Sequence, residues 1–175
     1  MPAKRAVDLT GSLILLLLLS PLLLALTAAV GATTRGSLLT RRERTGLGGS
    51  RFAMLTFRTT PVSPVGRLLR RHFLDQLPQL INVVRGEMSL VGPRPLPPED
   101  PEEAGFAGRA RLGVRPGMTG LWQTSGRSEL PWEEMAVLDL HYVEQHWLGL
   151  DLLILARTLP TAAAGRRAPR PVRLA

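Results

Sequence analysis

Apolar residues fill the first part of the chain almost without interruption. From Leu9 to Thr34 no residue is charged, and leucine occupies most positions between 13 and 26. As one continuous helix at 1.5 Å per residue, this stretch reaches roughly 39 Å, more than the roughly 30 Å of a bilayer hydrocarbon core. The pattern therefore predicts a helical segment with a membrane environment.

A Ser-Pro pair interrupts this apolar stretch near its middle. Pro21 has no backbone N–H, and its ring clashes with the carbonyl group four residues earlier, so a helix kinks or breaks there at a cost of about 3 kcal/mol. The hydroxyl of Ser20 can bond to the backbone groups that are freed, which makes a kink tolerable in lipid. We therefore expect the helix to bend or break at Ser20 and Pro21.

Basic residues flank the apolar stretch on both sides. Lys4 and Arg5 precede it, and four arginines follow it between residues 35 and 44. Because positive charge favours the cytoplasmic side, a straight span would send one basic cluster outward. Three interpretations stay open on these residues alone: a transmembrane span, a signal peptide cleaved among the small residues 25–32, and a re-entrant helix pair that enters and leaves by one face.

Shorter segments with a regular pattern follow. Glycines at positions 46, 48 and 49 predict a tight turn or hairpin, and residues 52–57 (FAMLTF) predict a short strand. Residues 66–86 have the apolar spacing of an interrupted helix. An amphipathic helix is expected from Pro131, and the apolar segment after it, residues 147–159, suits either a membrane interface or the domain core.

The interruption of the second helical segment provides the first candidate for chemistry. With Asp75 as an N-cap, Gln76 begins a new helix and Pro78 lies in its first turn, where proline is tolerated. The positive end of that helix and the nearby Arg70 and Arg71 all favour the ionised carboxylate. On local evidence Asp75 is either a simple helix cap or a reactive carboxylate.

Two proline-bearing loops carry candidate phosphate-binding residues. Arg94 lies between Pro93 and Pro95, in a stretch (residues 89–103) where so much proline excludes a helix and sets an extended path. A guanidinium group on such a stiff backbone suits bidentate recognition of phosphate, although a solvated arginine fits the pattern equally well. Arg115 precedes another Pro-Gly pair in the glycine-rich loop 113–127.

Composition narrows the classes of partner. The formal net charge of +8 and the sequence pI of about 11.5 indicate an anionic partner, such as a phospholipid surface, a phosphorylated substrate or nucleic acid. The chain has no cysteine, which excludes disulfides, a thiolate nucleophile and cysteine-based zinc sites. Only charge supports nucleic-acid binding, without a recognisable binding module, so we expect no nucleic-acid partner.

Six motifs, in their order along the chain, resemble one family. They are KRAVDL, RERTGLGG, FRTT, LDQLPQLINVVRGEMSLVGPRP, VRPGMTGLWQTSGR and LDLHYVEQHWLGLDLLIL, and they cover roughly residues 4–159. The chain is similar to the bacterial sugar transferases, monotopic phosphoglycosyl transferases, in the small form that has only the catalytic domain and its anchor. The LPQL…GEMSLVGPRP block is the most specific of these motifs.

The resemblance implies an α+β fold that is mostly helical. It implies a re-entrant membrane helix-break-helix at residues 1–36, broken at Ser20 and Pro21. A small membrane-associated catalytic domain with amphipathic interfacial helices would follow at 37–160, and a basic flexible tail at 161–175. The protein would then be monotopic in the inner (cytoplasmic) membrane, in contact with membrane lipids, with its catalytic domain facing the cytoplasm.

The resemblance also implies a reaction, in which a phospho-sugar passes from a UDP-sugar to polyprenyl (undecaprenyl) phosphate and UMP is released. This is the first membrane step of surface polysaccharide, including exopolysaccharide, or glycoconjugate assembly. Asp75 matches the family's nucleophile, which forms a covalent aspartyl-phosphosugar intermediate, and Asp75 would also bind the Mg²⁺ cofactor. Because phosphoryl transfer depends mostly on positioning and charge neutralisation, Arg94 is the first candidate for phosphate binding, with Arg58 and Arg115 next.

The sequence departs from the family pattern at three places near the expected site. Gln76 stands where the family has glutamate, Thr56 replaces a usual lysine, and the chain after Thr60 lacks a longer polar excursion. A glutamine can hydrogen-bond but cannot act as a base or bring negative charge to Mg²⁺. These departures motivate an alternative function, a catalytically weakened or inactive relative that serves as a membrane-bound partner in glycan assembly.

Overall fold

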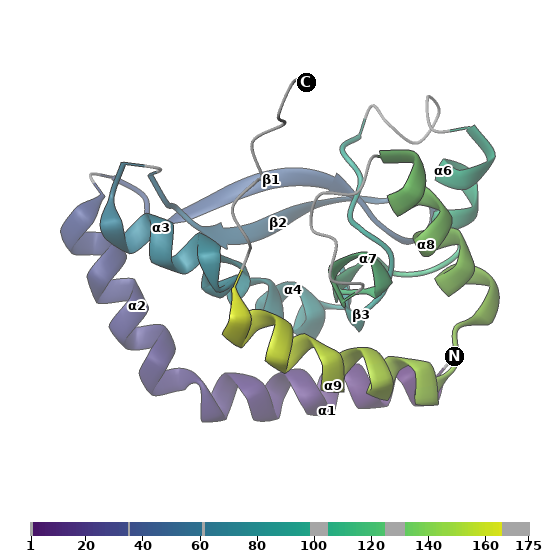
Figure 1. The fold of residues 1–175 in the computed structure, drawn as a ribbon, viewed down its shortest axis with the longest axis horizontal. Helices are drawn as coiled ribbons and strands as arrows, with labels where there is room; N and C mark the ends of the chain where they lie inside the picture. The colour runs from purple at the N-terminus through teal and green to yellow at the C-terminus, as the bar shows by residue number, and fades with distance from the viewer. Residues whose placement is uncertain (1, 35, 61, 99–104, 125–131, 166–175) are drawn as a thin grey trace, which may run out of the picture.

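The computed structural model describes residues 2–34, 36–60, 62–98, 105–124 and 132–165. The acidic run 99–103 and most of the expected basic tail lie outside these ranges. The described chain is mostly helical, with two small two-stranded sheets, which confirms the α+β class. Figure 1 shows helices along the lower side of the molecule and a long hairpin along the upper side.

The expected break in the apolar stretch is confirmed. Helix α1 (Pro2–Leu18) and helix α2 (Ser20–Thr33) meet at Leu19 and are bent by 65°. Pro21 lies in the first turn of α2, where its missing N–H costs nothing, and the hydroxyl of Ser20 donates to the carbonyl of Leu17 at 2.8 Å. Within the described ranges no single helix has the length and hydropathy to cross a membrane, whereas this bent pair passes that test together.

The glycine-rich turn forms the predicted hairpin. Strand β1 (Leu39–Thr45) pairs antiparallel with β2 (Arg51–Phe57), and Arg42 lies opposite Met54. A short 3₁₀ turn, η1 (Leu47–Gly49), joins them, with Gly48 and Gly49 at φ values of 65° and 81° that favour glycine.

The segment around Asp75 differs from the expected helix cap. After α3 (Pro64–Arg71), Phe73 adopts a left-handed φ of 58°, and Asp75 lies inside a separate 3₁₀ turn, η2 (Leu74–Gln76). The next helix, α4 (Gln79–Arg85), has Pro78 at its N-cap position. The prediction that Asp75 caps this helix is therefore wrong, because the turn at Phe73 gives Leu74–Gln76 a helical turn of their own.

Helix α4 is attached to the hairpin by one fully buried side chain. The amide of Asn82 accepts a hydrogen bond from the backbone N–H of Leu55 at 3.0 Å and donates one to the carbonyl of Ala53 at 2.8 Å. A side chain on α4 thus acts as a strand partner for β2. Because η2 directly precedes α4, this contact also fixes Asp75 relative to the hairpin.

Two glycine-bearing loops form a short parallel sheet that the sequence pattern did not predict. Strand β3 (Ser89–Val91) pairs with β4 (Gly117–Thr119), and the backbones cross tightly where Gly92 meets Gly117. A Cβ atom on Gly117 would lie only 2.1 Å from the backbone nitrogen of Gly92. Helices α6 (Gly105–Arg111) and α7 (Leu121–Thr124) flank β4 in the chain.

The last two helices close the core. Helix α8 (Trp132–Gln145) confirms the expected amphipathic helix, and α9 (Leu148–Ala164) runs past the expected start of the tail. On α9, Ile154 is buried while Leu152 and Leu159 are exposed, so the helix has one face in the core and one apolar face outside. The main core consists of Phe52, Leu80, Val83, Met88, Leu90, Val91, Tyr142 and Ile154.

Candidate active site

Asp75, Gln76 and Arg94 line the same cavity, as the sequence led us to expect. The cavity has a volume of about 440 Å³, within the roughly 300–1,000 Å³ typical of small-molecule sites. It lies between the hairpin, η2 and α7. Asp75 is the one acidic side chain among its described lining residues, and it shares the cavity with four arginines: Arg42, Arg44, Arg70 and Arg94. Such a site favours a ligand with several negative charges.

One face of the hairpin provides two of these arginines. Because side chains alternate along a strand, Thr40, Arg42 and Arg44 of β1 share a face, and all three line the cavity. Thr56 of β2 lies opposite Thr40 and also lines the cavity. Position 56, where the family usually has lysine, therefore lines the cavity that contains Asp75. Arg42 and Arg44 on the paired strand β1 were not among the site residues predicted from the sequence.

Arg70 approaches the cavity from α3 and is held by the loop after β2. Its Nε donates to the hydroxyl of Thr59 at 2.7 Å, and its Nη2 donates to the Thr59 carbonyl. The guanidinium group is thus fixed at the edge of the cavity that also contains Asp75. Of the two arginines that the sequence placed near Asp75, Arg70 lines this cavity and Arg71 does not.

The backbone and side chain of Arg94 are both fixed by contacts. Its backbone N–H donates to the carboxylate of Asp139 at 3.1 Å, and its guanidinium lies over the Trp122 ring, 5.2 Å from the centroid. Its Nη1 lies 3.3 Å from the sulfur of Met135. An exposed arginine is therefore presented from a stiff loop, which suits the bidentate binding of phosphate.

A buried ion pair supports the Arg94 loop from behind. Asp139 of α8 forms an ion pair with Arg111, with 3.2 Å between Oδ2 and Nη2, and both side chains are almost completely excluded from solvent. Burial raises the pKa of Asp139 from 3.8 to about 6, although Arg111 and the Arg94 N–H oppose the shift. Burial also lowers the pKa of Arg111, which the carboxylate partly offsets.

Gln76 is paired with a second amide across the cavity. The Nε2 of Gln123, on α7, donates to the Oε1 of Gln76 at 3.3 Å. The side chain at position 76 therefore directs its oxygen toward α7, an orientation that a glutamate of the same shape would also allow.

The other two predicted phosphate-binding arginines lie elsewhere. Arg58 lines a surface pocket with Arg41 and Ser37, and Arg115 donates to the carbonyl of Gly86 at 2.8 Å, at the end of α4. Neither lines the cavity that contains Asp75. Their parts in phosphate binding stay predictions from the resemblance.

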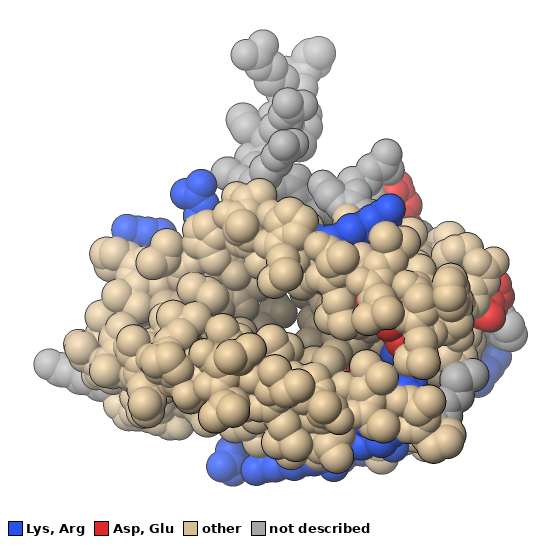
Figure 2. All heavy atoms as spheres, turned by 90° about the horizontal axis from the view of Figure 1, so that it is seen from below, with Lys and Arg blue, Asp and Glu red and all other residues tan. Residues whose placement is uncertain are grey.

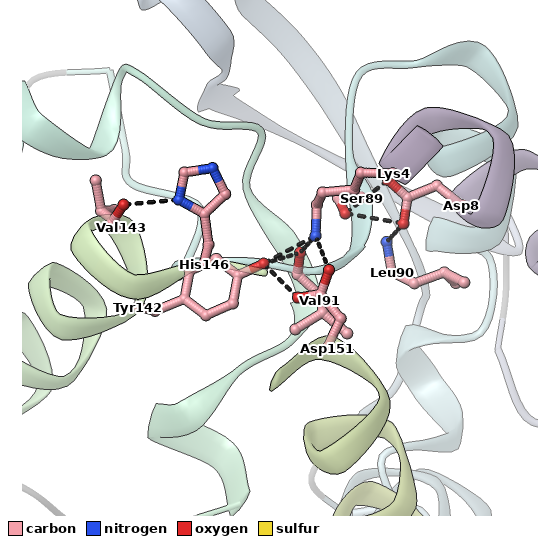
Figure 3. A network of polar contacts seen from close by, with 9 residues as sticks. All are labelled: Lys4, Asp8, Ser89, Leu90, Val91, Tyr142, Val143, His146 and Asp151. Atoms are coloured by element: carbon pink, nitrogen blue, oxygen red, sulfur yellow. Dashed lines mark hydrogen bonds and ion pairs between the residues drawn. The ribbon is translucent and has the colours of Figure 1, made fainter. Parts of the chain in front are cut away.

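Two polar clusters join α1 to the strand that leads to Arg94, as Figure 3 shows. In the first, Lys4 donates to the carboxylate of Asp151 at 2.6 Å, to the hydroxyl of Tyr142 at 2.8 Å and to the carbonyl of Val91 at 3.0 Å. The Tyr142 hydroxyl donates to Asp151 at 2.7 Å. Burial, reinforced by this hydrogen bond to Asp151, raises the pKa of Tyr142.

The second cluster centres on Asp8, one turn further along α1. Its buried carboxylate accepts from the hydroxyl of Ser89 at 2.8 Å and from the backbone N–H of Leu90 at 3.0 Å. Together the two clusters hold both ends of β3, and Arg94 follows that strand by three residues. The KRAVDL motif thus positions the site although it lies outside the cavity, a role that its spacing alone did not reveal.

Asp75 and Gln76 suit a metal ion whose remaining coordination positions are filled by a phosphorylated ligand and water. Within the described ranges no three His, Cys, Asp or Glu side chains cluster to hold a metal. Asp75 offers a carboxylate and Gln76 an amide oxygen, and Mg²⁺ is commonly bound by one or two carboxylates together with substrate phosphates and water. These residues therefore fit Mg²⁺ that arrives with, or is retained by, a phosphorylated ligand.

Comparisons with known proteins agree with one another. Residues 1–165 match the family model described as "Bacterial sugar transferase". The chain is 35% identical to "Exopolysaccharide production protein ExoY" of Rhizobium meliloti, over 94% of this chain and 87% of the relative. It is 37% identical to "UDP-glucose:undecaprenyl-phosphate glucose-1-phosphate transferase" of Caulobacter vibrioides (90% and 68%) and 38% identical to "Undecaprenyl-phosphate glucose phosphotransferase" of Komagataeibacter xylinus (94% and 36%).

Proposed function

The chain belongs to the bacterial sugar transferase family, and from this we propose that it transfers a phospho-sugar from a UDP-sugar to polyprenyl phosphate, releasing UMP. The product would be a polyprenyl diphosphate sugar, the first lipid-linked intermediate of a surface polysaccharide or glycoconjugate. The observation that carries this proposal is the cavity in whose described lining one carboxylate, Asp75, lies with four arginines.

We propose that Asp75 is the nucleophile of a two-step transfer. In the first step a carboxylate oxygen of Asp75 attacks the phosphorus bonded to the sugar, and the bond to the leaving phosphate oxygen breaks, so UMP departs with the electron pair. In the second step a phosphate oxygen of the lipid attacks the same phosphorus, and the Asp75 carboxylate is released. Splitting one transfer into two makes each step easier, and atoms and charge balance in both.

The arginines supply charge stabilisation for these steps. Phosphoryl transfer leaves little covalent work to the protein, so catalysis depends on holding the phosphates in line and neutralising their charge. Arg94, held by Asp139 and Trp122, and Arg70, held by Thr59, are two donors whose positions are fixed by these contacts. Mg²⁺, bound by Asp75 and Gln76 together with substrate phosphates, would neutralise further charge on the diphosphate when present.

We propose that the bent α1–α2 pair is a re-entrant anchor, with both ends on the cytoplasmic side of the inner membrane. Large apolar side chains on the pair are exposed, among them Leu17 at 75% and Leu24 at 72%. Figure 2 shows the face seen from below as largely uncharged, with patches of Lys and Arg along its upper and lower edges and Asp and Glu at one side. An apolar face with basic patches at its edges suits a leaflet with anionic headgroups. The anchor (1–36), the catalytic part (37–160) and the tail (161–175) are the units of this proposal.

A UMP-release assay on the full chain in membranes tests the proposed reaction. We expect UMP from at least one UDP-sugar when polyprenyl phosphate and Mg²⁺ are supplied. Asp75→Asn keeps the shape of the side chain and removes the nucleophile, so release should fall at least about 10³-fold while the thermal transition is retained. A folded wild type that releases no UMP from a broad panel of UDP-sugars would sink the proposal.

That negative outcome would favour the second candidate function. Gln76 and Thr56 both line the cavity at positions where the family pattern has glutamate and lysine. A protein weakened by these changes would serve as a membrane-bound partner in glycan assembly. Large activity gained by combining Gln76→Glu with Thr56→Lys would then identify the chain as a weakened transferase, whereas an active wild type excludes this candidate.

A further inference from the structure

A second cavity lies against the first and differs from it in character. It has a volume of about 450 Å³ and is lined almost wholly by apolar atoms. Its walls come from the α1–α2 bend, from the η2 region and from one side of α9, and include Leu15, Leu19, Leu159 and Ala162. A cavity of this size with so little polar surface offers few partners to water, so it favours an apolar occupant.

The two cavities share a wall of four residues. Phe73, Gln76, Met118 and Gln123 line both, and the amide pair of Gln76 and Gln123 is the polar part of that wall. A single ligand that reaches both sides needs an apolar body on one side of this pair. It needs an anionic head on the other side, where Asp75 and the arginines lie.

The apolar cavity also borders the exposed apolar face of the molecule. Leu159 and Leu22, which line it, are 75% and 37% exposed. Figure 2 shows a hollow near the centre of this largely uncharged face. A lipid can therefore enter from the face that we propose lies in the membrane, without carrying its chain through water.

We propose that this cavity holds the isoprene units nearest the phosphate of the lipid acceptor, and that the phosphate passes the Gln76–Gln123 pair to reach Asp75. The assignment rests on the proposed function and adds the place where the acceptor binds. One chain with one terminal phosphate fits a passage between two side chains, whereas a bulk phospholipid branches into two chains next to its headgroup. The cavity has room for only part of a polyprenyl chain, and the rest extends into the bilayer.

Photolabelling of the full chain in nanodiscs tests this site independently of catalysis. The probe is a prenyl phosphate with a benzophenone near its phosphate end, competed with unlabelled polyprenyl phosphate. Ala162→Trp fills the cavity and Leu159→Trp narrows its exposed edge. Leu153→Trp is the matched control, because Leu153 lies on the same helix, is 45% exposed and does not line the cavity.

We expect wild-type and Leu153→Trp protein to be labelled at cavity residues, with labelling at least about tenfold weaker in Ala162→Trp and reduced in Leu159→Trp. UMP release from UDP-sugar in a single turnover without lipid acceptor should be equal in all four proteins, which also shows that the variants fold. Equal labelling of Ala162→Trp and wild type overturns the proposal, and so does competition by phospholipid as effective as that by polyprenyl phosphate. If no UMP is released but Ala162→Trp still abolishes labelling, the lipid site stands and the proposed reaction fails.

Discussion

The ammonium group of Lys4 lies 2.6 Å from the carboxylate of Asp151, although 147 positions separate the two residues in the chain. This contact joins the first turn of helix α1 to α9 and, through Tyr142 and Val91, to the strand before Arg94. The anchor and the catalytic part are therefore one packed structure, in which the start of the chain helps to hold the site.

We expect Lys4→Met to lower the free energy of unfolding by about 3 kcal/mol, because it leaves the buried Asp151 carboxylate without its cation. The shift in the denaturation midpoint in detergent measures this loss. Glu43→Gln is the control, since Glu43 pairs with Arg51 at 3.7 Å with both side chains more than half exposed, and such pairs contribute less than about 1 kcal/mol. Equal effects of the two substitutions would contradict the role given to Lys4.

Arg94→Lys should lower kcat/KM for the UDP-sugar by about 10²-fold, because lysine cannot donate in a planar, bidentate way or stack on Trp122 in the same manner. Arg58→Lys and Arg115→Lys make the same chemical change at positions outside the cavity. We expect each of them to alter kcat/KM less than about threefold. Equal losses for the three variants would instead support the prediction that Arg58 and Arg115 also bind phosphate.

Gln76→Glu should lower the Mg²⁺ concentration that gives half-maximal UMP release by about tenfold, because a second carboxylate joins Asp75 in the cavity. Gln76→Met is the comparison that keeps the length of the side chain but removes the oxygen that we propose binds Mg²⁺, and with it the hydrogen bond with Gln123. An Mg²⁺ titration that is the same in all three proteins would show that residue 76 has no part in holding the ion.

Stability should depend on pH through Asp139, whose pKa is raised by burial from 3.8 to about 6. Below about pH 4 the Asp139 carboxyl is protonated in both the folded and the unfolded protein, and its contribution to the free energy of unfolding is fully present. As the pH rises toward 6 the unfolded chain loses this proton first, so about 3 kcal/mol of stability is lost across that window, and little more above it. The difference in unfolding free energy between wild type and Asp139→Asn, measured from pH 4 to 7, should follow this curve. A constant difference would contradict it.

The elements that sequence predicted best are those set by local chemistry. The break at Ser20 and Pro21, the turn at Gly48 and Gly49, and the helix that contains Tyr142 depend on backbone rules or on a repeated pattern. Such rules act within a few residues and do not require knowledge of the rest of the fold.

The parts that sequence did not reveal depend on distant contacts. In the sequence Arg42 and Arg44 are two of the four arginines that follow the apolar stretch, and only the pairing of the hairpin decides that their face of β1 lines the cavity with Asp75. The three-residue strand β3 is too short to show an alternating pattern, and it forms because Gly92 and Gly117 allow two loops to approach closely. No local pattern predicts the left-handed φ of 58° at Phe73, after which Asp75 lies inside a turn of its own and not at the expected cap.

The 65° bend between α1 and α2 also has a consequence for how the protein is made. In the re-entrant seating that we propose, no polar segment has to cross the hydrocarbon core during insertion, so the chain can fold against the membrane from one side. Each copy would add cross-sectional area to a single leaflet, and a dense population of copies would bend the bilayer toward the side on which they lie. With this seating, insertion would depend on how tightly the lipids are packed and would not need a translocation channel.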